Sequence, residues 1–133
     1  MGGWFKDRDF VEFGPYVSST MAAFRRGKVF MRFSYWPTDA PDFVIMAGLG
    51  ELREGWGLFG PRKPLLRGMG LWEAIPDPEK RAFLRDPFHD RVELTRLLER
   101  IRDEAMRYAE PLLDDPLTLG KAIREKPRRQ PPN

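Results

Sequence analysis

Apolar and polar positions alternate with period two through much of the first fifty residues, a pattern typical of β-strands. The pattern predicts strands over 16–24, 29–36 and 43–49, and it is compatible with a fourth, short strand over 9–13. The stretch "RRGK" holds a glycine between two apolar runs, as a tight hairpin turn requires. The two prolines and two aspartates of "PTDAPD" then end the second strand. We therefore expect consecutive strands to pair antiparallel.

The strand over 29–36 differs from an ordinary half-buried strand because large apolar groups lie on both of its faces. Every second residue from 29 to 35 is apolar, and the opposite face combines Phe30 and Trp36 with Arg32 and Ser34. A single covering layer buries only one face of a sheet. The pattern therefore raises the question of what covers the second face.

Between residues 50 and 75 six glycines and two prolines interrupt any regular period, so we predict a long glycine-rich loop. Its apolar content indicates a loop packed against the rest of the domain. The string "GWGLFG" within it matches the glycine spacing of dinucleotide-binding loops. Prolines follow it directly, however, and no βαβ unit surrounds it, so we interpret it as packing.

Residues 77–126 carry helical signals. Asp77 followed by Pro78 indicates a helix start, and so does Asp115 followed by Pro116. Asp90 precedes Glu93 by three residues, a variant of the capping box. After it, apolar residues recur at helical spacing and predict one long amphipathic helix. This stripe consists of Leu94, Leu97, Leu98, Ile101, Ala105, Tyr108 and Leu112.

Together these elements predict one α+β domain over 1–126. An antiparallel sheet of three or four strands, within about 9–50, carries the long C-terminal helix on one face. The loop over 50–75, the N-terminal cluster Trp4/Phe5/Phe10 or another protein chain would cover the second face. A basic, proline-rich tail occupies 127–133.

Composition narrows the class of protein. The 133 residues are 41% hydrophobic and 32% charged, which suits a folded globular chain. The chain has no cysteine, which excludes disulfides and thiolate metal sites and favours a cytoplasmic location. No apolar run is long enough to cross a membrane. The net charge of the whole chain is +3, and the residues from Lys121 onward carry a net charge of +4. Residues 1–120 therefore have a net charge of −1.

Three candidate sites follow from these patterns. For a partner-binding surface, which we favour, the candidate is the second face of the sheet together with the aromatic residues Trp36, Trp56, Phe59 and Trp72. For a weak RNA-binding surface, the alternative, they are the hairpin cations Arg25, Arg26, Lys28 and Arg32, helped by the tail. A second alternative is a small enzyme that uses His89 with Asp86, Asp90 and Glu93, although the two last residues already serve as caps.

No residue set combines the spacing and the surrounding structure of a catalytic triad, a metal site or a cofactor loop, so we predict no catalytic residue, metal or cofactor. The expected partner is another protein chain or a second copy of this chain, with nucleic acid as the weaker option and no membrane.

The segments "FRRGKVFMRFSYWPTDAPDFVIMAGLG" and "LLERIRDEAMRYAEPLLDDP" resemble a pattern in small uncharacterised bacterial proteins. In these, a basic β-hairpin precedes an amphipathic helix that ends in a phrase like "YAEPLL". The resemblance covers roughly 20–50 and 94–116. It implies an antiparallel sheet backed by a C-terminal helix, and a bacterial, cytoplasmic origin. Several such families resemble toxin-immunity or defence-associated proteins, which implies a non-enzymatic protein-binding role.

Overall fold

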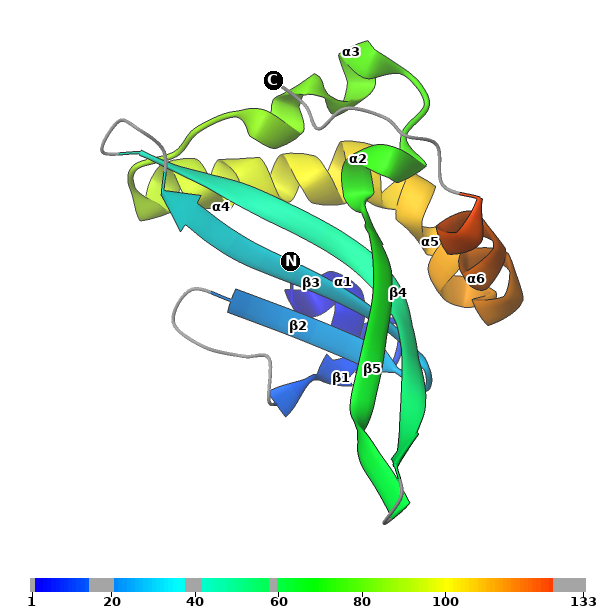
Figure 1. The fold of residues 1–133 in the computed structure, drawn as a ribbon. Coiled ribbons are helices and arrows are strands. Elements are labelled where there is room, and N and C mark those ends of the chain that lie inside the picture. Colours follow the sequence, from blue (N-terminus) through cyan, green and yellow to red (C-terminus); the bar gives the residue numbers. More distant parts are fainter. Residues whose placement is uncertain (1, 15–20, 38–41, 58–59, 126–133) are drawn as a thin grey trace.

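The computed structural model describes residues 2–14, 21–37, 42–57 and 60–125, without the side chains of 53–57 and 60–67. Its centre is a five-stranded antiparallel sheet in which neighbouring strands follow each other in sequence (Figure 1). The strands are β1 (Val11–Glu12), β2 (Met21–Arg26), β3 (Val29–Pro37), β4 (Phe43–Gly57) and β5 (Gly60–Gly70). The predicted α+β class and antiparallel pairing are confirmed, but the sheet has five strands and not three or four.

The additional strand comes from the region that was predicted as a loop over 50–75. Most of it forms a long hairpin of β4 and β5, which extends beyond the rest of the sheet (Figure 1). The loop prediction was wrong because several glycines lie in pairs two positions apart (48 and 50, 55 and 57, 68 and 70), a spacing that preserves the period of a strand. Gly48 pairs with Gly70 and Gly50 with Gly68, while Leu49 and Met69 pair between them on the other face.

All the described helices except the N-terminal one follow the sheet in the chain, and the helical layer covers one face of the sheet. After α1 (Gly2–Lys6) at the N-terminus come α2 (Leu71–Ala74), α3 (Pro78–Arg81), the 3-10 turn η2 (Ala82–Arg85), α4 (Arg91–Arg100), the π-turn η3 (Ile101–Ala105), α5 (Met106–Asp114) and α6 (Pro116–Arg124). The segments α4, η3 and α5 form one long rod across the sheet (Figure 1). Among the described helices, none combines the length and apolar character that crossing a bilayer requires.

The predicted helix starts are confirmed. Asp77, Asp90 and Asp115 each accept a hydrogen bond from a main-chain N–H of the first turn, and proline follows the first and the last of them. The carboxylate of Glu93 accepts from the main chain of His89, one residue before the capping position that a standard capping box uses. These contacts satisfy N–H groups that a helix start would otherwise leave unpaired.

The π-turn η3 changes which side of the long rod is buried. A π-turn adds one residue to the helical repeat, so the apolar stripe advances by one position after Ala105. The predicted stripe continued through Tyr108 and Leu112, which are half-buried. The fully buried residues of this half of the rod are Met106, Ala109 and Leu113.

The main core lies between the sheet and this helical layer. We call the sheet surface beneath it the helix face. Phe5 of α1 packs there against Phe10, Phe24 and Phe33. The N-terminal aromatic cluster therefore belongs to the helix face, and the expectation that it covers the second face was wrong. Sheet residues of this core include Val29, Met31, Phe33, Ile45, Ala47, Leu49 and Met69.

We call the second surface of the sheet the open face. One end of it is closed by a small cluster in which Phe13, next to β1, packs with Ala23 and Phe30, joined by the half-buried Leu52. The edge of Phe13 meets the ring of Phe30 at 6.4 Å between centroids. The chain thus covers part of the open face with its own residues, and the remainder carries the candidate site.

Candidate functional site on the open face

The strand register fixes which residues share the open face. Ser34 lies opposite Met46, and Arg32 lies opposite Gly48, which in turn pairs with Gly70. Alternation along the strands places Trp36 on the same side as Arg32 and Ser34. This end of the open face therefore combines one cation, two large apolar side chains and glycines without side chains.

These residues border a hollow of about 370 Å³, which we call the open-face hollow. Its floor is formed by Gly48, Gly68 and Gly70, which have no side chains; Gly68 is exposed, whereas Gly70 is buried. Volumes of this size fall in the range of ligand-binding clefts. The remaining lining consists of Phe30, Arg32, Ser34, Trp36, Met46, Ala47, Leu49, Met69, Trp72 and Glu73.

Trp72 forms one wall of the open-face hollow by folding back over the end of β5. A Cβ atom at Gly70 would lie 2.3 Å from the ring atoms Cη2 and Cζ3 of Trp72, so only glycine leaves room for this arrangement. Glu73 holds the same turn, because its carboxylate accepts a hydrogen bond from the Gly70 N–H at 3.0 Å. The wall is therefore fixed by local sequence at the junction of β5 and α2.

Trp36 and Arg32 provide the accessible chemistry. Trp36 is 57% exposed, and its indole N–H donates to the Ser34 hydroxyl at 3.1 Å, which orients the ring. Arg32 is exposed and makes no hydrogen bond or ion pair in the described part of the chain. An oriented aromatic ring beside an unpaired guanidinium is suited to binding an anionic or carbonyl-rich partner.

The structure places the predicted partner-binding residues as follows. Trp36 and Trp72 both line the open-face hollow, although they are 36 residues apart in sequence. Trp56 belongs to β4, but its side chain lies outside the described part, and Phe59 lies outside it altogether. Sequence reasoning missed the glycine floor, for which a period-two reading of the glycines would have been the signal.

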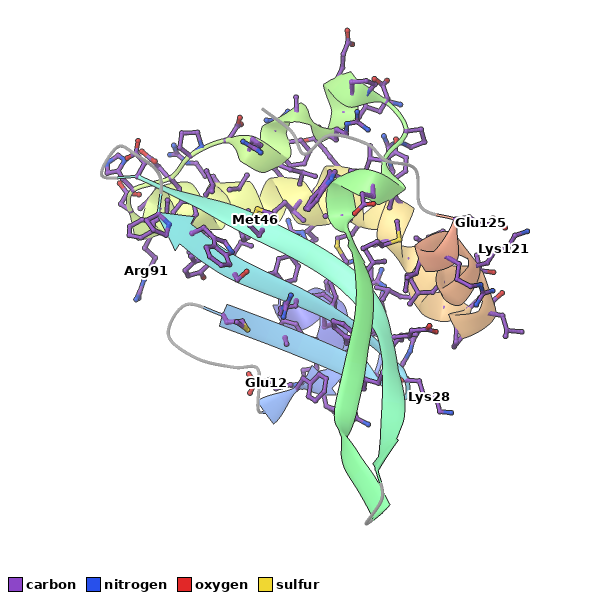
Figure 2. All side chains as sticks on the ribbon, viewed as in Figure 1. Glu12, Lys28, Met46, Arg91, Lys121 and Glu125 are labelled. Carbon is purple, nitrogen blue, oxygen red and sulfur yellow. The ribbon has the colours of Figure 1, made fainter. Side chains whose placement is uncertain are left out.

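The predicted nucleic-acid-binding cations do not form one surface. Arg26 is held on the helix face, where it donates to the main-chain carbonyls of Arg8 and Leu113 and pairs with Asp114 at 2.8 Å. Arg25 stacks over Phe13 at 5.2 Å from the ring centre. Lys28 lies at the hairpin turn, at the opposite end of the sheet from Met46 (Figure 2). Of the four cations, Arg32 is the one that lines the open-face hollow.

His89 lies on the helical side, in an exposed cluster before α4. Its Nδ1 atom is 3.0 Å from a Glu93 carboxylate oxygen, and its Nε2 atom is 3.6 Å from Asp90. Asp86, the fourth member of the predicted cluster, faces Arg100 at 3.6 Å instead. Both carboxylates nearest to His89 also accept main-chain hydrogen bonds, which accounts for their positions as caps of α4.

Comparisons with known proteins add no family to this description. No family model matches the chain, and neither the curated proteins nor the solved structures that were searched contain a match.

Proposed function

We propose that this protein is a non-enzymatic binding module whose open face docks another protein. The observation that carries the proposal is the hollow of about 370 Å³ with Trp36, 57% exposed, at its border. Oriented tryptophans beside a depression are typical centres of protein interfaces. Several families of the small bacterial proteins that the sequence resembles are in turn similar to toxin-immunity or defence-associated proteins, which are modules of this kind.

Charge favours an acidic partner. Residues 21–70, which contain most of the sheet, carry eight basic and four acidic side chains, whereas residues 71–125 carry ten basic and thirteen acidic ones. Arg32 makes no ion pair in the described part of the chain, so a partner carboxylate can bind it without breaking an existing contact. We therefore assign the partner as a protein with an acidic, partly apolar surface.

A comparison of variants on immobilised protein tests this function. Trp36→Ala removes the exposed ring, Arg32→Glu reverses the charge, and Val92→Ala is the matched control because Val92 is 59% exposed on α4. We expect an acidic protein from the source cells to bind the unaltered protein and Val92→Ala equally. Retention by Trp36→Ala should fall about tenfold or more, as for an interface hot spot.

Binding of the purified partner is then measured by calorimetry with the same variants. Equal affinity for Trp36→Ala and Val92→Ala would overturn the assignment of the open face. Retention that nuclease treatment abolishes would replace the proposal by RNA binding through Arg32 and the basic tail. A dimer in light scattering that Trp36→Ala dissociates would replace the acidic partner by a second copy of this chain.

A further inference from the structure

A second feature lies beside the open-face hollow, at the free edge of β4. The ladder between β4 and β5 ends where Gly48 pairs with Gly70. Farther along the same edge, Phe43 pairs with Phe88 through two hydrogen bonds of 2.7 and 2.8 Å. Between these two points no described strand lies along β4, and Ile45 is in the middle of the gap.

The direction of the hydrogen bonds shows which main-chain groups of β4 face the gap. The N–H and C=O of Phe43 both point to Phe88, away from β3, whereas the N–H of Leu52 bonds to Lys28 on the β3 side. Main-chain groups alternate in direction along a strand, so odd-numbered residues here point away from β3. The N–H and C=O of Ile45 therefore point together into the gap.

A hollow of about 160 Å³ occupies this place, and we call it the edge slot. Four consecutive residues of β4, Val44, Ile45, Met46 and Ala47, border it together with Trp72, Leu84 and Arg85. Successive side chains of a strand point to opposite faces, so a hollow that touches four in a row reaches the edge of the main chain.

Two residues that line the edge slot, Trp72 and Arg85, have polar groups without a partner among the described residues. The indole Nε1 of Trp72 is buried and finds no hydrogen-bond acceptor in that part of the chain. The benzo edge of this ring lies against Gly70, so the N–H edge points away from it. Arg85 is exposed and forms no ion pair or hydrogen bond in the described part of the chain. A buried donor without an acceptor is costly unless a ligand supplies one.

We propose that the edge slot binds one residue of an extended segment of the partner protein by strand addition. The C=O of that residue accepts from the N–H of Ile45, and its N–H donates to the C=O of Ile45. Its apolar side chain fills the hollow beside Leu84, and a neighbouring carboxylate pairs with Arg85. Strand addition is a common way in which sheet edges bind peptides.

The length of the gap limits the addition to a single residue pair. The Phe88 bridge blocks one end and the start of α2 the other, while hydrogen-bonded pairs recur only at every second residue. The inference rests on the proposed function for the identity of the partner as a protein, but the slot can be tested with a defined small molecule.

The probe is N-acetyl-leucine N-methylamide, which carries one apolar side chain between two peptide groups. It is titrated into the isotope-labelled full chain and followed by amide NMR. We expect the Ile45 amide and the Trp72 indole N–H signals to shift together with a dissociation constant on the order of 1 mM, given the size of the probe. The indole signal of Trp4, on the helix face, should stay in place.

Matched probes separate the contacts. N-acetylglycine N-methylamide lacks the side chain, and the fully N-methylated leucine probe lacks both N–H groups, so each should bind about tenfold more weakly or not at all. N-acetyl-leucyl-aspartate N-methylamide should bind about two- to fivefold more tightly than its asparagine counterpart. Arg85→Gln should remove that difference.

Two results would overturn the proposed binding at the edge slot. One is equal affinity for the leucine probe and its fully N-methylated form. The other is unchanged Ile45 and Trp72 signals at a probe concentration of roughly 20 mM, 20-fold the expected dissociation constant. Leu84→Phe places a larger side chain in the hollow and should abolish the shifts, with circular dichroism to check folding. If Leu84→Phe does not fold, the N-methylated probe decides alone. Failure of the slot with an intact Trp36-dependent partner would leave the proposed function standing.

Discussion

The helix face and the open face belong to the same strands, yet they are built from different residues. On β4, Ile45, Ala47 and Leu49 face the helices and are buried, while Met46 and Gly48 alternate with them on the open face. The helix face is packed by a continuous layer from α1 to α6. The open face has its own cluster at only one end, around Phe13 and Phe30.

This difference separates what holds the fold from what is available for binding. Truncating a side chain on the packed helix face lowers the free energy of unfolding of the protein, because a cavity remains. A face with a glycine floor has little packing to lose. Selection for stability alone would not require Trp36 to remain 57% exposed beside that floor.

Truncation of one residue on each face should give the largest contrast. Leu49 is 1% exposed on the helix face, and Leu49→Ala should lower the free energy of unfolding by about 2–5 kcal/mol. Met46 lines the open-face hollow, and Met46→Ala should cost less than about 1 kcal/mol. Urea titration, with the midpoint read at unchanged slope, measures both values. Equal costs would show that the open face is packed in solution.

Much of the fold could be predicted from the sequence because its signals are local. The alternation that marks β2, β3 and the start of β4, and the aspartates that cap α3, α4 and α6, each depend on residues within a few positions of one another. The amphipathic rod followed from helical spacing as far as Ala105. After Ala105, the extra residue of η3 shifts the stripe of buried residues by one position, and no residue type in 101–105 indicates that shift in the sequence.

The second half of the sheet and most of the site depend on contacts between distant residues. The high glycine content led to the prediction of a loop where β5 lies, since a count of glycines cannot distinguish a loop from a strand that has glycines on one face. Trp36 was predicted from the second face of its strand and Trp72 from the aromatic residues of the expected loop, but their common hollow depends on how β5 pairs with β4. To predict the edge slot, one must know that the pairing of β5 with β4 stops at Gly70, where Trp72 folds back.

The two arginines that the sequence grouped together should behave in opposite ways. Arg26 bonds to two main-chain carbonyls, pairs with Asp114 and stacks on Phe10, so Arg26→Ala should cost about 2 kcal/mol. Arg32→Ala on the open face should change the free energy of unfolding by less than about 0.5 kcal/mol. Both are measured by urea titration.

Arg26→Lys is the control for this pair of variants. It keeps the charge but loses the planar group that reaches several acceptors at once, so its stability should lie between those of Arg26→Ala and the unaltered protein. A stability loss for Arg32→Ala as large as that for Arg26→Ala would mean that Arg32 supports the fold, and it would remove the guanidinium from the binding surface.

The smallest effect concerns the joint between α5 and α6 on the covered side. The Thr118 hydroxyl donates to the Asp115 carboxylate at 2.6 Å and, with the Leu117 and Thr118 main chain, lowers the pKa of Asp115 below its usual value of 3.8. A lowered folded-state pKa stabilises the protein above the unfolded value, and this contribution disappears as pH falls through the folded-state pKa. Acidification below pH 3.8 should therefore lower the protection of the α6 amides, measured against the intrinsic exchange rate at each pH, before it affects β3.

Thr118→Ala removes the main cause of the shift and should raise the pKa of Asp115 toward 3.8, as followed by NMR titration of the carboxyl carbon. In Asp115→Asn the amide oxygen can still cap α6 but does not titrate in this range. Exchange in α6 of that variant should lose this acid-dependent step. If α6 and β3 instead open together at every pH in the unaltered protein, α6 unfolds cooperatively with the sheet. The expectation that α6 opens separately from the sheet would then be wrong.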